Sequence, residues 1–183
     1  LWYNALKIMA LLANRYGEQE AANKYLIMAN KAKKSFNEKF WNKQQKSLFD
    51  VINHFVPDFS LRPNQIIAVS LDFTMLDCEN SKKVVKLVEH EFLTPYGLRT
   101  LSQNDFRYKN EYTGLAKERD LSYHNGTVWP WLIGPFITAY LKVWGNNLEK
   151  RKFAESLLAL FFGQQLYQYG LGTINEIFTG QEP

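Results

Sequence analysis

The sequence predicts an all-α fold in which consecutive helices pair as antiparallel hairpins. Apolar residues recur at three- and four-residue spacing along most of the chain, as on the buried face of an amphipathic helix. Too few alternating stretches remain to build a sandwich or a parallel sheet. Three architectures suit such helix pairs: a bundle, a right-handed solenoid, or part of an α/α toroid. Long polar excursions at residues 41–62 and 92–126 favour the toroid, in which loops at one end of the ring build a pocket.

The first hairpin combines helices expected at residues 2–16 and about 18–40. The apolar stripe of the first helix ends at Gly17, a residue type that commonly terminates helices. Lysines fill the face of the second helix opposite its apolar stripe. The connection is so short that the two helices are expected to run antiparallel.

The remaining helices form two further pairs, expected at about 62–73 with 81–91, and at about 128–144 with 148–168. The helix at 62–73 is apolar on all sides, which predicts burial of both its faces. Pro135 lies inside the helix at 128–144, so we expect a kink or a restart near Gly134.

Composition limits the classes of function. The 183 residues suffice for one domain with a real core, and 46% hydrophobic with 15% aromatic residues excludes a disordered tail. The net charge of +4 is modest, and its lysines are expected on a solvated helix face, which argues against nucleic-acid binding. The uncharged run at 128–141 is too short to cross a membrane. Cys78 is the single cysteine, so no intrachain disulfide can form, and the cytoplasm is the expected compartment.

The most distinctive stretch of the chain is residues 122–131, which hold two of the five tryptophans and the Tyr-His-Asn triplet. An Asn-Gly turn is followed by Thr127, which can cap a helix, and by Pro130, which suits a first helical turn. Aromatic faces stack on the apolar faces of pyranose rings, while Asn and His side chains satisfy hydroxyl groups. The stretch therefore predicts one wall of a sugar site, with candidate contacts from His124, Asn125 and Trp129. At the start of a helix Trp131 would point away from Trp129, towards the core.

Glu176 is the best candidate for an acid–base residue. It lies in a glycine-bounded loop beside apolar residues, although a solvated or helix-capping glutamate would share this pattern. Inverting hydrolysis of a glycoside needs two carboxylates about 6.5 to 9.5 Å apart. Asp50 is the in-chain alternative for the second acid, and the residues beside it suggest the end of a strand.

Arginines supply further candidates for sugar binding. Arg99 follows a Gly-Leu turn and is expected to line the substrate entrance. Arg119 and Asp120 precede the central loop, where they could hold it as a buried pair, bind hydroxyl groups, or form a surface ion pair. Arg62, before a proline, is expected chiefly to bind backbone carbonyl groups. No cofactor is expected, and no metal site, because His54, His90 and His124 are scattered and far from any cysteine cluster.

Four motifs together resemble the C-terminal domain of glycogen debranching enzymes, of the amylo-α-1,6-glucosidase type found in bacteria and archaea. The motifs keep that family's order and spacing, and the resemblance covers essentially the whole chain. They are Arg62-Pro63-Asn64-Gln65, Tyr96-Gly97-Leu98-Arg99-Thr100-Leu101-Ser102, Tyr123-His124-Asn125-Gly126-Thr127-Val128-Trp129-Pro130-Trp131 and Gly172-Thr173-Ile174-Asn175-Glu176-Ile177-Phe178.

The resemblance implies an (α/α)6 barrel that hydrolyses α-1,6-linked glucose at branch points of glycogen or branched α-glucan, with inversion. Glu176 matches the position of the general base, whereas the general acid of the family lies upstream of Leu1. Residues 1–183 are therefore expected to be part of the catalytic domain, without the first half of the barrel and its final helix. An open edge of apolar helices would then pair with another copy or with the rest of the parent chain.

Three alternatives remain open at this level. The chain could be a carbohydrate-binding or structural helical unit without turnover, or a helical-repeat module whose aromatic loop binds a peptide. It could also belong to another α/α-toroid glycosidase with a different α-glucoside substrate.

Overall fold

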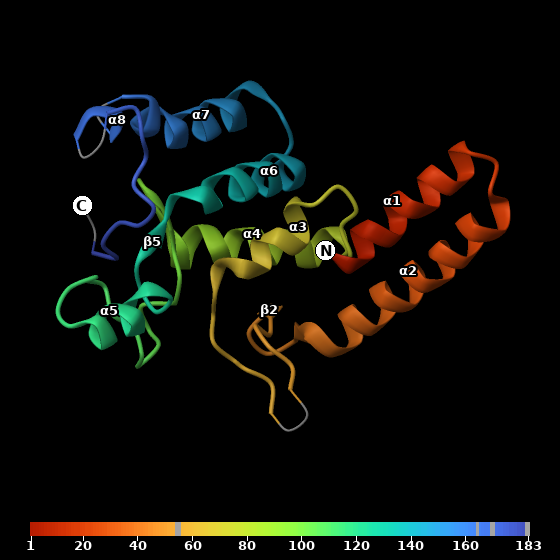
Figure 1. Ribbon diagram of the computed structural model, residues 1–183, viewed down its shortest axis with the longest axis horizontal. Coiled ribbons are helices and arrows are strands. Elements are labelled where there is room, and N and C mark those ends of the chain that lie inside the picture. Colours follow the sequence, from red (N-terminus) through yellow and green to blue (C-terminus); the bar gives the residue numbers. More distant parts are fainter. Residues whose placement is uncertain (54–55, 164, 169–170, 182–183) are drawn as a thin grey trace.

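The computed structural model describes residues 1–53, 56–163, 165–168 and 171–181. The chain is mostly helical, and its helices pair as hairpins, as the sequence predicts (Figure 1). The helices are α1 (Trp2–Arg15), α2 (Gln19–Phe40), α3 (Ile66–Ser70), α4 (Cys78–Phe92), α5 (Ala116–Tyr123), α6 (Ile133–Trp144), α7 (Leu148–Phe162) and α8 (Gln165–Gln168), with 3-10 turns η1 (Pro63–Gln65) and η2 (Pro130–Leu132). The strands are β1 (Trp41–Asn42), β2 (Ser47–Leu48), β3 (Leu93–Thr94), β4 (Gly97–Arg99) and β5 (Val128–Trp129).

Helices α1 and α2 form an antiparallel pair that extends away from the other helices (Figure 1). Their shared core contains Tyr3, Leu6 and Ala29. Asn4 joins the pair to the rest of the chain, because its side-chain Nδ2 donates to the carbonyl oxygen of Phe73 at 2.9 Å and its Oδ1 accepts from the backbone nitrogen of Phe73 at 2.9 Å. Large apolar side chains of the α1 segment remain exposed, as the open edge predicts; they are Leu1, Trp2, Ile8, Met9, Leu11, Leu12 and Tyr16.

The main core lies where α6 packs against α3 and α4, with α7 on its other side. Ile66 and Val69 of α3 are fully buried, and the residues between them are partly buried, so the predicted burial is complete on one face only. The helix expected at 62–73 is also shorter, because it begins as η1 and α3 ends at residue 70. Phe92 and Phe136 are also fully buried in the same cluster. Burying each such side chain contributes roughly 1.5–3 kcal/mol, so this cluster fixes the position of α6 and of the loop that leads into it.

The helix predicted at 128–144 is wrong at its first residues. Val128 and Trp129 instead form strand β5, the edge of an antiparallel sheet ordered β3-β4-β5 in which Leu98 pairs with Trp129. Pro130 then opens η2, and the expected restart occurs at Ile133, the first residue of α6. Pro135 consequently lies in the first turn of α6, where a missing N–H group removes no intrahelical hydrogen bond.

Other differences also lie in the connections. Residues 116–123 were expected within an irregular excursion but form α5, a short helix whose side chains are nearly all exposed. The helix predicted at 148–168 is described as α7 and α8, with Gln164 outside the described residues. Within the excursion expected at residues 41–62, β1 and β2 pair as a short antiparallel hairpin. In the described part of the chain, no helix combines the length and apolar character needed to cross a bilayer.

Candidate functional site

The loop between α5 and α6 approaches its neighbours through the backbone. The backbone nitrogen of Lys109 donates to the carbonyl oxygen of Asn125 at 2.7 Å, and the backbone nitrogen of Gly126 donates to Oγ1 of Thr100 at 2.8 Å. A Cβ atom at Gly126 would overlap the carbonyl oxygen of Lys109, and φ here is +156°. Only glycine combines this conformation with so close an approach.

Thr127 was predicted to cap the helix that follows it. Its hydroxyl instead donates to the carbonyl oxygen of Tyr123 at 2.7 Å, at the end of the preceding helix α5. The predicted helix cap is therefore wrong, because the next residues form a strand and offer no helix N-terminus. Thr127 is fully buried, so the contact fixes the turn between α5 and β5.

Arg62 also holds this loop. Its Nη1 donates to the carbonyl oxygens of His124 at 2.6 Å and Thr100 at 3.1 Å, and its Nη2 donates to Oδ1 of Asn125 at 3.0 Å. Its Nε lies 3.4 Å from Oδ2 of Asp50. The carbonyl-binding role predicted for Arg62 is confirmed, and Asp50, the alternative second acid, is an ion-pair partner of this arginine.

An aromatic group lies at the junction of α5 and β5. The ring of Trp129 is stacked on His124, with centroids 5.6 Å apart and an interplanar angle of 8°, and meets Tyr123 edge-on at 4.8 Å. The indole Nε1 of Trp129 donates to the carbonyl oxygen of Tyr123 at 3.0 Å. The indole is therefore held both by ring packing and by a hydrogen bond.

The C-terminal segment is fixed next to this group. The backbone groups of Val128 and Phe178 exchange two hydrogen bonds of 2.9 Å, and the Phe178 ring stacks on Tyr96 with centroids 4.9 Å apart. The carbonyl oxygen of Gly180 accepts from the hydroxyl of Tyr108 at 2.8 Å and from Nε of Arg99 at 3.0 Å. The segment that contains Glu176 is thus anchored just after that residue.

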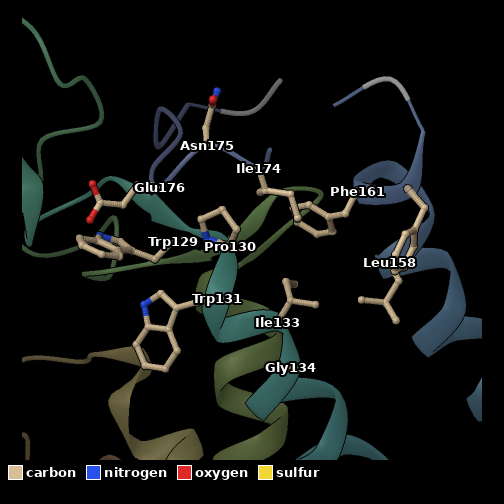
Figure 2. A pocket seen from close by; sticks show the side chains of 11 residues that line it. Trp129, Pro130, Trp131, Ile133, Gly134, Leu158, Phe161, Ile174, Asn175 and Glu176 are labelled. Carbon is tan, nitrogen blue, oxygen red and sulfur yellow. The ribbon is translucent and has the colours of Figure 1, made fainter. Parts of the chain in front are cut away.

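Glu176 lies at the rim of a pocket of about 510 Å³ (Figure 2). Its carboxylate lies close to the indole of Trp129 in this view, and Asn175 and mostly apolar side chains form the rest of the wall. Oε1 of Glu176 accepts a hydrogen bond from the hydroxyl of Tyr123 at 2.9 Å. This hydrogen bond is the main cause of a raised pKa for the Tyr123 phenol, with smaller contributions from desolvation and from the negative charge of Glu176. The pocket is lined by Trp129, Pro130, Trp131, Ile133, Gly134, Leu158, Phe161, Phe162, Ile174, Asn175 and Glu176.

The structure therefore brings Glu176 and Trp129 together, as the sequence predicts, with His124 stacked on the indole. Asn125 does not line the pocket, and its Nδ2 donates to the carbonyl oxygen of Leu121 at 2.7 Å. Trp131 was expected in the core, but it lines the pocket and is 58% exposed. The helical geometry assumed for it does not apply, because Trp129 is in a strand and Trp131 in a 3-10 turn.

The other predicted sugar contacts lie outside the pocket lining. Arg99 is buried, at 5% exposure, and directed at the C-terminal backbone. Arg119 is exposed, with its guanidinium 6.0 Å from the ring centroid of Tyr112. Asp120 is exposed as well, and no ion pair joins it to Arg119 in the described part of the chain. Their roles in sugar binding stay predictions.

One contact was missed by sequence reasoning, the hydrogen bond between Tyr123 and Glu176. The two residues are 53 positions apart, and no local pattern relates them. The triplet that contains Tyr123 was the available signal, but it was assigned to sugar contact. Among the described residues, no group of three His, Cys, Asp or Glu side chains could hold a metal ion; His54 lies outside them.

Comparison with known proteins gives a family for this chain. A family model described as amylo-alpha-1,6-glucosidase matches residues 1–183. The chain belongs to this family. The match includes all the site residues described above.

Two individual proteins are similar to this chain. The glycogen debranching enzyme of Saccharomyces cerevisiae is 30% identical over 89 residues, which cover 45% of this chain and 6% of the yeast protein. A solved structure named "Sialidase" superposes with a TM-score of 0.75 at 17% identity, over 98% of this chain and 16% of that one. The chain thus spans far less than two thirds of either protein, and the second likeness concerns the fold alone.

Proposed function

We propose that this chain is part of an inverting glycoside hydrolase that removes α-1,6-linked glucose at branch points of glycogen or a related branched α-glucan. Glu176 acts as the general base in this proposal. The observation that carries it is the position of Glu176 at the rim of an aromatic pocket, beside Trp129. The membership of the amylo-alpha-1,6-glucosidase family supports the substrate class.

The pocket has the groups that such a reaction needs on the side of the attacking water. The faces of Trp129 and Trp131 offer stacking surfaces for a pyranose ring, while the apolar wall lowers the local dielectric. Oε1 of Glu176 is occupied by the Tyr123 hydroxyl, which leaves Oε2 to accept a proton from water. The attacking water can therefore be activated on one face of the sugar.

The second carboxylate of the reaction comes, in this proposal, from a part of the protein other than residues 1–183. Glu176 is the sole carboxylate among the described residues that line the pocket, and Asp50 is paired with Arg62. The three hairpins would form about half of an (α/α)6 toroid. The exposed apolar face of α1 would then contact further helices of the ring, or another copy of the chain.

Substitution of Glu176 tests the proposal in the full-length protein. Glu176→Gln keeps the size of the side chain but cannot accept the proton, so glucose release from a phosphorylase-trimmed limit dextrin should fall by about 10²- to 10⁴-fold. Glu155→Gln, an exposed change on α7, is the matched control and should leave the rate unchanged. Glucose release by Glu176→Gln at the wild-type rate would remove Glu176 from the mechanism.

Glycan binding without turnover is the second candidate, because a single carboxylate lines the described pocket. Maltooligosaccharides would then raise the thermal midpoint of the full-length protein while no glucose is released from any α-glucan. Products formed from a panel of α-glucosides distinguish the branch-point activity from that of other toroid glycosidases.

A further inference from the structure

A tyrosine from another part of the chain donates a hydrogen bond to the proposed base. Tyr123 is the last residue of α5, and its hydroxyl donates to Oε1 of Glu176 at 2.9 Å. Within the part of the chain that the structure describes, this is the one hydrogen bond that the Glu176 side chain makes, and Glu176 is otherwise exposed. The orientation of the carboxylate therefore depends on this single donor.

Tyr123 is itself held firmly. Its ring meets Trp129 edge-on at 4.8 Å and packs at a tilt against Tyr112 at 5.8 Å. Its carbonyl oxygen accepts hydrogen bonds from Nε1 of Trp129 at 3.0 Å and from Oγ1 of Thr127 at 2.7 Å. Both the ring and the backbone of Tyr123 are thus fixed, so its hydroxyl defines a point in space for the glutamate.

We propose that Tyr123 is a positioning residue, which holds Oε1 of Glu176 so that Oε2 faces the attacking water; this rests on the function proposed above. In the step it supports, the water oxygen bonds to the anomeric carbon as the bond from that carbon to the leaving oxygen breaks. Oε2 takes the proton from water, and the general acid, a carboxylic acid, gives its proton to the leaving oxygen.

The phenol keeps its proton throughout this step. A tyrosine hydroxyl is protonated at neutral pH in any case, and the hydrogen bond to Glu176 is the first cause that raises the pKa of Tyr123 further. The same indole that offers a face to the sugar also holds Tyr123, so substrate stacking and base orientation share one support.

The test uses α-D-glucosyl fluoride and the full-length protein, because fluoride leaves without protonation by the general acid. Tyr123→Phe keeps the ring and removes only the donor, and kcat for fluoride release should fall by about 10- to 100-fold, as expected when a catalytic group is misplaced by about 1 Å. KM and the thermal midpoint should change little. Tyr16→Phe, which removes an exposed hydroxyl at the C-terminal end of α1, is the matched control and should retain the wild-type kcat.

Azide separates positioning from a structural role, because this nucleophile attacks the anomeric carbon without giving up a proton. Azide should restore fluoride release to Glu176→Ala, and to the double variant Glu176→Ala/Tyr123→Phe at the same rate, with β-glucosyl azide as the product, because Tyr123 acts only through the carboxylate. A wild-type kcat in Tyr123→Phe, or an azide-restored rate that is much lower in the double variant than in Glu176→Ala, would overturn the positioning role. If Glu176→Ala is fully active without azide, the proposed function fails; if only Tyr123→Phe is active, the positioning role alone fails.

Discussion

Replacing Arg62 should disrupt the wall of the candidate site and destabilise the fold. Its guanidinium donates to two carbonyl oxygens and one side-chain amide oxygen, and it also pairs with Asp50. The side chains of Arg62 and Asp50 are only 16% and 18% exposed, so solvent screens these contacts weakly. In Arg62→Ala the carbonyl oxygens lose their donor and Asp50 is left as a poorly solvated, unpaired charge.

The magnitude follows from these contacts. Each hydrogen bond to a charged group contributes about 1.5–3 kcal/mol, but the terms share one side chain and do not add. Breaking a largely buried ion pair from one side costs about 3–5 kcal/mol, and we expect Arg62→Ala to lower the free energy of unfolding by that amount. For a domain of this size the thermal midpoint should then fall by about 6–20 °C.

Two variants sharpen the measurement. Arg62→Lys retains the charge, yet one ammonium group cannot span the four acceptors of the planar fork, so about half of the loss should remain. Arg15→Ala removes an exposed arginine at the end of α1 and serves as the control. Unfolding in urea, followed by tryptophan fluorescence, gives the free energies. A change of less than about 1 kcal/mol in Arg62→Ala, the range typical of exposed pairs, would refute the clamp.

Two further variants test the loops around the site. Gly126→Ala should lower the free energy of unfolding by about 2–4 kcal/mol, since its Cβ would overlap the Lys109 carbonyl at a strained φ, whereas Gly134→Ala, with open space around it, should be neutral in the same urea titration. Asp105→Asn should cost about 1 kcal/mol at pH 7, because hydrogen bonds from Arg107 hold the pKa of Asp105 below its usual 3.8. A carboxylate whose pKa is lower in the folded state than in the unfolded state stabilises the fold at pH values above its unfolded pKa. This stabilisation is lost as the pH falls through the folded pKa. The difference from wild type should therefore narrow below about pH 3.8, and a difference independent of pH would contradict this assignment.

The helical pairs were predictable because their apolar residues repeat with a local period. The buried faces of α3 and α6 needed only that pattern, as did the hairpin of α1 and α2. The carbonyl-binding role of Arg62 was also within reach of the sequence. An arginine beside a rigid proline is a natural anchor for neighbouring backbone, and its contacts with Thr100 and His124 follow that expectation.

What the sequence did not reveal depends on pairing between distant residues. Val128 and Trp129 read as the start of a helix, but the partners that make them a strand are Leu98 and Phe178. Helix α5 was missed for the opposite reason, because it buries so little that no apolar stripe marks it. The proximity of Glu176 to the tryptophan loop was expected from the family resemblance. Its hydrogen bond to Tyr123 joins residues 53 positions apart and is evident only in the three-dimensional structure.

Strand β5 fixes the distance between two parts of the pocket wall. Trp129 lies in this strand, and the segment of Glu176 is bridged to its neighbour Val128, so one short piece of backbone sets the interval between indole and carboxylate. The connection from Thr100 to Leu121 lies between β4 and β5 in the chain. Residues 111–121 of this connection are exposed, so substitutions there can reshape the surface beside the site without changing the interval that β5 sets.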